Sequence, residues 1–291
     1  MVVVGSANAD LILSVDRTPR PGETVLALGD ACRSAGGKGL NQAVAAARAG
    51  ATTALVGAVG DDDAGRMLRA VLHGSTVDTA CLRTADLPTG LAVITVAADG
   101  ENSIVVVAGA NSGLTELTDA DLEAVTRAHV LLGQLEIPVE TFGVAAAAAR
   151  SNGCMVLLNA APARELPDSI WPLVDVLIVN EPEAAEIAHG RDLLELVPAV
   201  VTTLGAAGAR YTSRNHDDID VPALRARAVD TTGAGDTFCG VFAASLALDM
   251  PILPAMQRAA AAAAAAVERP GAVPSIPTRD EIEHRLREAG R

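Results

Sequence analysis

Short apolar runs alternate with helical patterns along most of the chain, and this alternation predicts the fold. Apolar runs at 2–4, 11–15, 25–28, 52–59, 130–135, 155–159, 174–179 and 200–204 predict strands. Helical patterns cover 119–127, 140–150, 240–248, 251–267 and 278–288. Two more end near residues 49 and 72, and another begins at 180–186. Strands and helices at this spacing predict an α/β fold, an αβα sandwich with a mainly parallel central sheet.

One region breaks the alternation, because residues 77–108 are rich in strand patterns and have little helix. Asp99-Gly100 lies between two strand patterns there and is a typical hairpin turn. Together with residues 11–33, this region could form a small separate sheet beside the main one. Such a sheet would be a lid if one face covered a site. The same face could equally be a dimer surface.

Polar residues follow several of the predicted strands directly, at the point where each strand ends. They are Asn8, Asp10, Glu136, Asn159, Asn180, Glu183, Thr203 and Gly205. In an open parallel sheet the carboxyl ends of the strands lie along one edge, where such folds bind ligands. The sequence therefore predicts a single site built from these positions. For Asn8 and Asp10 taken alone, turn formation is the simpler interpretation.

The glycine-rich stretch from Asp230 to Phe238 precedes an apolar run and predicts a helix whose first turn is built from residues 233–236. A helix N-terminus presents unpaired N–H groups and a partial positive charge, and glycines let these groups approach a phosphate. Asp236 places one carboxylate inside this turn. We therefore expect the turn to hold a transferring phosphoryl group while Asp236 accepts a proton from the attacking hydroxyl.

A second glycine-rich turn, residues 36–39, opens the helix that ends near residue 49. Its N–H groups could also bind an anion, and a plain turn with a solvated lysine is the alternative. The turn is not a Walker A loop, because Cys32 fills the first glycine position and Gly39 the hydroxyl position of that motif. Asn41 would lie one turn into the helix, on the side of the loop.

Composition and charge narrow the class of protein. The chain has 291 residues, 50% hydrophobic and only 2% aromatic, so alanine, valine and leucine must form a large core. The net charge of −14 disfavours nucleic acid or an anionic membrane as a partner. No apolar run is long enough for a membrane span, and no signal peptide pattern precedes Val2. The four cysteines form no CxxC pair, which argues against zinc and disulfides and fits a reducing cytoplasm.

Three motifs together carry a resemblance to a known family. Residues 36–41, with the pattern Gly-Gly-Lys-Gly-x-Asn, are similar to the N-terminal signature of the PfkB carbohydrate kinases, and residues 230–238 are similar to their C-terminal signature. Between them, Asn180 and Glu183 match the Asn-x-x-Glu motif of the family. Over essentially its whole length, the chain resembles the ribokinase branch of that family.

The resemblance implies a single Rossmann-like αβα domain over 1–291. It also implies a small β lid, drawn from about 9–34 and 86–108, that serves as the clasp of a homodimer. This expectation agrees with the strand-rich segments found from the pattern alone.

The resemblance also implies a role for each matching residue. Asn8, Asp10, Gly37, Lys38, Gly39, Asn41, Glu136 and Asp236 would bind the sugar hydroxyls. Asp236 would also be the catalytic base, and Gly233, Ala234 and Gly235 would form the anion hole for the γ-phosphoryl group. ATP would be bound by Asn180, Glu183, Thr203, Leu204, Gly205, Ala206, Ala207, Gly208, Gly235 and Asp236, and the first two would also serve the water shell of Mg²⁺. A monovalent cation, K⁺, would lie among Asp230, Thr232, Ala266, Arg269, Gly271 and Ser275.

These roles imply ATP-dependent phosphorylation of the primary O5 hydroxyl of D-ribose. A kinase for deoxyribose, fructose or a nucleoside is an alternative within the same class. A sugar-binding regulator without catalysis is an alternative of another class, and its expected mark would be loss of Asp236 or of the anion-hole glycines. A Rossmann dehydrogenase would need Gly-x-Gly-x-x-Gly near the first strand, and around Gly233 the third glycine position holds Phe238.

Two positions depart from the family pattern. Ala260 stands where ribokinases often carry His or Asn near the adenine, so we expect a side-chain contact to the base to be missing. Residues 189–199 form a shorter connection than is usual in the family, and we expect the helix there to be lost or reduced to one turn.

Overall fold

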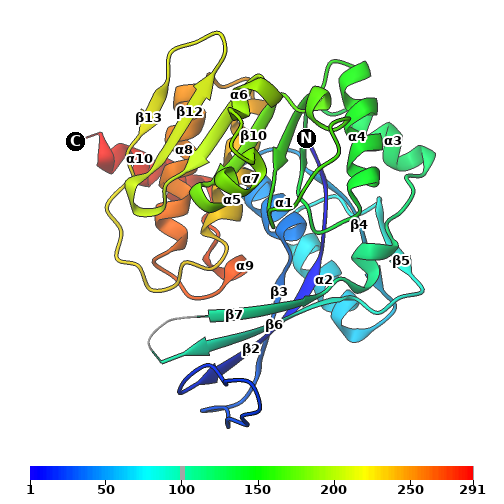
Figure 1. Cartoon of the computed structure of the whole chain (residues 1–291), viewed down its shortest axis with the longest axis vertical. Helices are drawn as coiled ribbons and strands as arrows, with labels where there is room; N and C mark the ends of the chain where they lie inside the picture. The colour runs from blue at the N-terminus through cyan, green and yellow to red at the C-terminus, as the bar shows by residue number, and fades with distance from the viewer. Residues whose placement is uncertain (99–101, 291) are drawn as a thin grey trace.

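The computed structural model describes residues 1–98 and 102–290, and its strands form two separate sheets (Figure 1). The large sheet consists of β1 (Val2–Val4), β4 (Ala54–Gly60), β5 (Leu82–Ala85), β8 (Val130–Gly133), β9 (Met155–Asn159), β10 (Val176–Asn180), β11 (Ala199–Thr203), β12 (Ala209–Ser213) and β13 (Ile219–Val221). Their order is β13-β12-β11-β10-β9-β8-β1-β4-β5. The pairs are parallel from β11 to β5, whereas β12 and β13 add antiparallel strands at one edge. The predicted fold class is confirmed.

Helices cover both faces of the large sheet. They are α1 (Lys38–Arg48), α2 (Asp63–Gly74), α3 (Asp119–Thr126), α4 (Val139–Ser151), α5 (Glu181–Ala188), α6 (Leu193–Leu196), α7 (Ala234–Ala247), α8 (Ile252–Ala266), α9 (Ala272–Ser275) and α10 (Arg279–Ala289), with 3₁₀ turns at Gly109–Gly113, Trp171–Leu173 and Gly205–Ala207. Helices α1, α2, α7, α8 and α10 bury side chains in one core, and α3, α4 and α5 in the other. Among the described residues, no helix has the length and apolar character needed to cross a bilayer.

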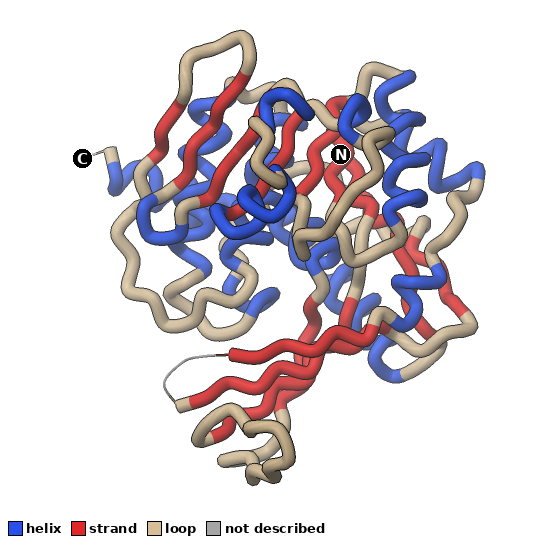
Figure 2. The backbone as a smooth tube through the Cα atoms, in the orientation of Figure 1, coloured by secondary structure: helices blue, strands red, loops and turns tan. Residues whose placement is uncertain are grey.

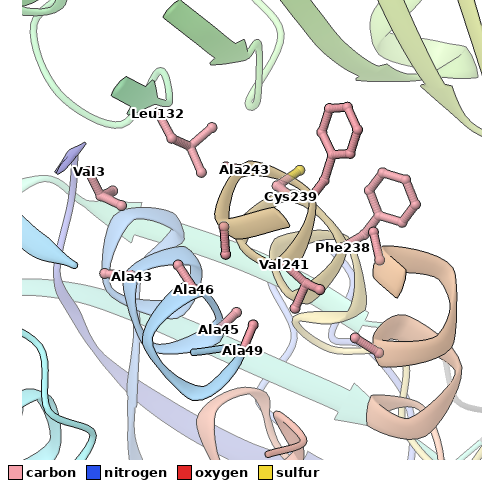
Figure 3. Close-up of a cluster of buried hydrophobic side chains, with 14 of the residues drawn as sticks. Val3, Ala43, Ala45, Ala46, Ala49, Leu132, Phe238, Cys239, Val241 and Ala243 are labelled. Carbon is pink, nitrogen blue, oxygen red and sulfur yellow. The ribbon is translucent and has the colours of Figure 1, made fainter. Parts of the chain in front are cut away.

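Alternate side chains of β1 point to opposite faces of the sheet, so the strand contributes to both hydrophobic cores. Val3 belongs to the core beneath α1 and α7, whereas Val2 and Val4 belong to the core beneath α4. Figure 3 shows the first of these cores, where small side chains of α1 and α7 face one another. The two helices approach so closely that a Cβ at Gly240 would lie 2.4 Å from the carbonyl oxygen of Gln42. Only glycine fits at that point of α7.

The small sheet projects from one side of the main body (Figure 2). Its strands are β2 (Asn8–Val15), β3 (Cys32–Gly36), β6 (Gly90–Ala97) and β7 (Asn102–Val107), in the order β3-β2-β6-β7. The β2–β6 pair is parallel, and the other two pairs are antiparallel. The predicted Asp99-Gly100 turn between β6 and β7 lies outside the described residues.

Two details of the predicted elements are wrong. Residues 25–28 form no strand, because Ala27 makes only an isolated bridge to Val15, where β2 ends, and Leu26 and Leu28 are exposed. The antiparallel partner of β2 is β3, so the glycine turn 36–39 follows a strand directly. The second error concerns β5, which extends the large sheet beside β4 rather than joining the small one.

The short 189–199 connection and the helix predicted at 251–267 have the structures that the sequence predicts. Helix α6 is a single turn of 4 residues. The eight alanines from Ala259 to Ala266 lie in α8, which packs tightly on α7. Strands β12 and β13 have no counterpart among the predicted elements, since their short runs are only partly apolar.

Replacing Gly240 by alanine tests the close contact between α1 and α7. The new Cβ would meet backbone of α1, so we expect Gly240→Ala to lower the free energy of unfolding by about 3 kcal/mol, the upper range for overpacking. Urea unfolding followed by circular dichroism measures this loss. Gly74→Ala is the matched control, because a Cβ at Gly74 would meet nothing within 4 Å. A loss at position 240 no larger than in the control would contradict the contact.

Candidate active site

The carboxyl ends of the parallel strands meet at one edge of the large sheet, next to the small sheet. Glu136, three residues beyond the end of β8, is the centre of a hydrogen-bonded group at this edge. Its Oε2 atom accepts from Ser6 Oγ at 2.5 Å, from the backbone N–H of Lys38 at 3.1 Å and from Asn8 Nδ2 at 3.5 Å. The structure thus brings together the end of β1, the start of β2 and the glycine turn before α1.

The glycine turn needs glycine for two different reasons. Gly37 has φ 88°, in the region that side chains rarely adopt, and it directly precedes α1. Gly39 lies against the end of β1, and a Cβ there would be 2.5 Å from the backbone nitrogen of Ser6. The turn therefore presses the first residues of α1 onto the strand end, which places Lys38 and Asn41 at the site.

Asp10 is buried on β2 and faces two other carboxylates. Burial, the largest cause, and the nearby charges of Glu136 and Asp236 together raise the pKa of Asp10 to about 7. The carboxylate of Asp10 lies against Gly36, where a Cβ would come within 2.1 Å of Oδ2. A carboxyl group with a pKa of about 7 can hold or release its proton near neutral pH, so Asp10 is suited to donate or accept hydrogen bonds with a polar ligand.

Asn111, which the sequence did not identify, fixes the orientation of Asn8. It lies in the 3₁₀ turn after β7 and is fully buried. Its Oδ1 accepts from the backbone N–H of Ala7 at 2.9 Å, and its Nδ2 donates to Asn8 Oδ1 at 2.7 Å. Asn8 Oδ1 is therefore an acceptor in this bond, and Asn8 must present its Nδ2 toward Glu136 and the site.

Asp236 lies in the first turn of α7 and is held by amides of α1. Asn41 Nδ2 donates to Asp236 Oδ2, and Gln42 Nε2 donates to Asp236 Oδ1, both at 2.9 Å. Gln42 also donates to Asn159 Oδ1 at 2.9 Å and accepts from Gln134 Nε2 at 2.6 Å. The sequence predicted Asn41 and Asp236, but Gln42 and Gln134 carry no signal of their own, because a buried amide is recognisable only by its partners.

A pocket of about 160 Å³ opens at the N-terminus of α7. The residues that line it include Lys38, Asn159, Asn180, Glu183, Thr203, Gly233, Gly235 and Asp236. Gly233 precedes α7 with φ 72°, so the first N–H groups of the helix are presented without a side chain in the way. Burial alone would lower the pKa of Lys38, but the carboxylates of Asp236, Glu136 and Glu183 outweigh it and raise the pKa. Lys38 therefore stays cationic beside the helix N-terminus.

Asn180 and Glu183 form a capping box at the start of α5. The backbone N–H of Asn180 donates to Glu183 Oε2 at 2.9 Å, and that of Glu183 donates to Asn180 Oδ1 at 2.8 Å. The pair thus has a structural use in starting the helix, in addition to its position on the 160 Å³ pocket.

A second pocket of about 570 Å³ shares Thr203 and Gly235 with the first one. Of the residues predicted for ATP, it is lined by Thr203, Gly205, Ala206, Gly208 and Gly235, whereas Leu204 and Ala207 lie in the same turn without lining it. The loop 223–228 forms another wall, which the sequence did not indicate. Ala260 of α8 lines the pocket together with Ala263 and Ala264, so this wall is made of methyl groups.

The residues predicted for a monovalent cation lie around the loop that enters α7. Both carboxylate oxygens of Asp230 accept hydrogen bonds from backbone N–H groups. Oδ1 accepts from Thr232 at 2.9 Å, and Oδ2 accepts from Gly271 at 2.7 Å. Burial would raise the pKa of Asp230, but these hydrogen bonds outweigh it and lower the pKa. The backbone N–H of Arg269 donates to the carbonyl of Ala266 at 3.1 Å.

Ser275, the last of these residues, donates its hydroxyl to the carbonyl of Ala272 at 2.7 Å. Ala272 in turn lies next to Gly233, where a Cβ would be 3.0 Å from the Cβ of Ala272. The loop after α8 therefore supports the N-terminal turn of α7 from behind.

Comparison with known proteins identifies the family. The sequence matches the pattern of the pfkB family carbohydrate kinases over residues 1–279. The chain belongs to this family. Curated pfkB relatives include a ribokinase of Haemophilus influenzae, 38% identical over 304 aligned residues, and a ribokinase of Bacillus subtilis, 39% identical over 291. In both cases 98% of this chain and 98% of the relative are covered. The chain is also similar to a solved structure, Arabidopsis thaliana ribokinase complexed with ribose and ATP, with a TM-score of 0.92 and 33% sequence identity. The superposition covers 98% of this chain and 97% of the Arabidopsis chain.

The raised pKa of Asp10 predicts how stability depends on pH. Because the folded-state pKa of about 7 lies above the ordinary value of 3.8, the folded state holds this proton more tightly than the unfolded state. The carboxylate therefore destabilises the protein at pH above 7, and this penalty decreases by about 1.4 kcal/mol per pH unit as the pH falls toward 4. We expect Asp10→Asn to raise the melting temperature at pH 8, and to raise it much less at pH 5.

Differential scanning fluorimetry at the two pH values measures this difference. Asp86→Asn, which removes the same charge from an exposed position, is the control and should show no such pH dependence. A melting temperature of Asp10→Asn that is unchanged or lower at pH 8 would show that the buried carboxylate is not under electrostatic strain.

Proposed function

We propose that the protein transfers the γ-phosphoryl group of ATP to the O5 hydroxyl of D-ribose and so forms ribose 5-phosphate and ADP. The observation that carries the proposal is the position of Asp236, a buried carboxylate in the first turn of α7. It lies between the hydrogen-bonded group around Glu136 on one side and the two connected pockets on the other. The similarity to ribokinases over nearly the whole chain supports ribose as the acceptor.

The acceptor sugar would lie among Asn8, Asp10, Asn41, Glu136 and the turn 37–39. Carboxylate and amide groups bind vicinal hydroxyls well, because they accept or donate two hydrogen bonds at fixed spacing. Asn41 Oδ1 is buried and has no hydrogen-bond partner among the described residues, so it is available to accept from a sugar hydroxyl. The small sheet carries Asn8 and Asp10, and it would act as a lid that excludes water.

Asp236 would accept the proton of the O5 hydroxyl as that oxygen bonds to the γ-phosphorus. The bond from phosphorus to the bridging oxygen of ADP breaks in the same displacement. The backbone N–H groups of Gly233, Ala234 and Gly235, with the charge of Lys38, would stabilise the negative charge of the transferring group. Three carboxylates beside the sugar would repel a phosphate there, which favours the helix N-terminus as its position.

The nucleotide would occupy the 570 Å³ pocket, with its base against the methyl groups of α8. When bound, Mg²⁺ would neutralise phosphate charge, and the oxygen atoms of Asn180 and Glu183 suit its water shell. Among the described residues, no group of three or more His, Cys, Asp or Glu could hold a metal ion by itself. The phosphate oxygens would therefore supply the direct ligands.

The loop around Asp230 would hold K⁺ through the carboxylate, the backbone at Thr232 and Gly271, and carbonyl oxygens near Ala266 and Arg269, with Ser275 nearby. These oxygen donors fit a hard monovalent cation. Since Ala272 supports Gly233, a cation in this loop would order the anion hole without touching the substrate.

A homodimer through the small sheet is part of the proposal. Its edge strand β7 exposes four consecutive apolar residues, Ile104 to Val107, at 46–66% of their surface. An exposed apolar edge strand favours association, because its unpaired backbone groups can pair with a strand of another chain. A second copy of this chain would cover it. We also propose a cytoplasmic location and neither nucleic acid nor a membrane as a partner, in keeping with the charge of −14.

An assay of ATP consumption against a panel of sugars, with and without K⁺, tests the reaction. We expect turnover with ribose to exceed that with deoxyribose, fructose or a nucleoside, and to rise when K⁺ is added. Asp236→Asn keeps the shape of the base but cannot accept the proton, so we expect turnover to fall by at least about 10³-fold while ribose binding by calorimetry changes little. Near-normal turnover of this variant would remove the base assignment.

The dimer is tested by placing a charge on the exposed strand. We expect Val105→Lys to convert the dimer into a monomer in sedimentation equilibrium, because the charge would be buried in the interface. Val144→Lys is the matched control, since Val144 is an exposed valine of α4 on the main body. If the unaltered protein sediments as a monomer, or both variants behave alike, the small sheet is not the interface.

A further inference from the structure

Gln42 differs from the proposed sugar ligands because it is closed off from the site. It is fully buried, and every polar atom of its side chain has a partner within the protein. Asn41, its neighbour on α1, still has an unused acceptor that a sugar could engage. Of the two amides that hold Asp236, Gln42 thus has no atom left for a substrate, whereas Asn41 has one.

The partners of Gln42 allow only one orientation of its amide group. Gln42 Oε1 accepts from Gln134 Nε2, and Gln42 Nε2 faces two acceptors, the Oδ1 atoms of Asp236 and Asn159. Rotating the amide by 180° would place its oxygen against both acceptors and its nitrogen against a donor. Asn159 is itself held, because its Nδ2 donates to the carbonyl of Ile178 at 3.2 Å.

The chain of amides connects Asp236 to the strand ends of the large sheet. Gln134 follows β8 and lies against Gly5, where a Cβ would come within 2.0 Å of Gln134 Oε1. Asn159 ends β9, and Ile178 belongs to β10. The carboxylate of Asp236 is thus oriented by three neighbouring strands, through one side chain of α1.

We propose that Gln42 is a positioning residue for phosphoryl transfer. By binding Asp236 Oδ1 permanently, it fixes the rotamer of the carboxylate. Oδ2 accepts one hydrogen bond from Asn41 Nδ2, and its second lone pair can then accept the proton of the acceptor hydroxyl. This proposal rests on the function proposed above, in which Asp236 is the base. A misplacement of reacting groups by about 1 Å lowers turnover by about 100-fold, so the effect of losing Gln42 is expected in kcat rather than in sugar affinity.

Gln42→Leu and Gln42→Glu remove the N–H donor in two different ways. Leucine replaces the amide with an apolar group of similar size, and glutamate keeps the acceptor for Gln134 while placing a carboxylate beside Asp236. For both variants we expect kcat with ribose and ATP to fall by about 100-fold, with the ribose Kd from calorimetry within about threefold of the unaltered enzyme. If the leucine variant does not fold, the glutamate variant, which differs from glutamine by one atom, supplies the measurement.

Ser245→Ala is the control for a merely structural effect. Ser245 is a fully buried polar residue further along α7, and its hydroxyl donates to the carbonyl of Val241 and accepts from Arg258. We expect this variant to lose thermal stability while its kcat below the melting temperature is unchanged. A kcat of the Gln42 variants within threefold of normal, or a loss of ribose affinity as large as the loss of kcat, would overturn the proposal.

Asp236→Asn, measured in the same series, separates the two proposals. If Asp236→Asn is inactive while the Gln42 variants are normal, Asp236 remains the base and only the positioning role of Gln42 fails. If Asp236→Asn turns over normally, the base assignment fails together with everything that depends on it.

Discussion

The close crossing of α1 and α7 is the contact on which the rest of the site depends. At the crossing, Gly240 of α7 faces the carbonyl oxygen of Gln42 with no space for a side chain. Asp236 lies one turn before Gly240 in α7, and its carboxylate accepts hydrogen bonds from the side chains of Asn41 and Gln42 of α1. The close packing of the two helices thus determines the position of the Asp236 carboxylate relative to the groups on α1. Alanine-rich faces make so short a distance possible, because larger side chains would separate the helices.

Charge is distributed unequally over the two halves of the site. Asp10 and Glu136 lie on one side, and the N-terminus of α7 with Lys38 lies on the other, where Glu183 is the neighbouring carboxylate. The negative half suits neutral hydroxyl groups, which can donate to carboxylates, and disfavours anions. The positive half suits phosphate oxygens. Asp236 stands at the boundary, so a hydroxyl and a phosphoryl group can meet there without either occupying the wrong half.

Sequence patterns predicted the parts of the fold that depend on local chemistry. The period of buried strands gave the parallel sheet, and the two glycine-rich turns gave the starts of α1 and α7, because glycine is required there by φ and by close contact. The prediction of a strand at 25–28 was wrong for a physical reason: the run is apolar yet mostly exposed, and it pairs with the end of β2 only through the single bridge from Ala27 to Val15. An apolar pattern predicts a strand only where a partner exists.

The partners of the candidate site residues were harder to predict. Gln42 and Gln134 are buried amides whose use depends on residues more than ninety positions away in the chain, and Asn111 acts on Asn8 from 103 positions away. Such residues look like ordinary polar positions in the sequence. The loop 223–228 has no motif either, and it lines the larger pocket only because the chain folds back over α8. Motifs located the groups proposed to meet substrate, whereas the structure was needed to find what orients them.

The alanine helix α8 has a consequence for the design of the pocket proposed to hold the nucleotide. Ala260, Ala263, Ala264 and Val267 follow the spacing of one helix face and line the larger pocket. Ala255, Ala259, Ala262 and Ala266 follow the same spacing on another face and are buried in the protein interior. The two stripes are separate, so a hydrogen-bonding side chain could be installed on the pocket stripe without enlarging any residue of the interior stripe. In the proposed nucleotide pocket, selectivity for the phosphate donor could therefore be changed one residue at a time, without altering the packing that positions Asp236.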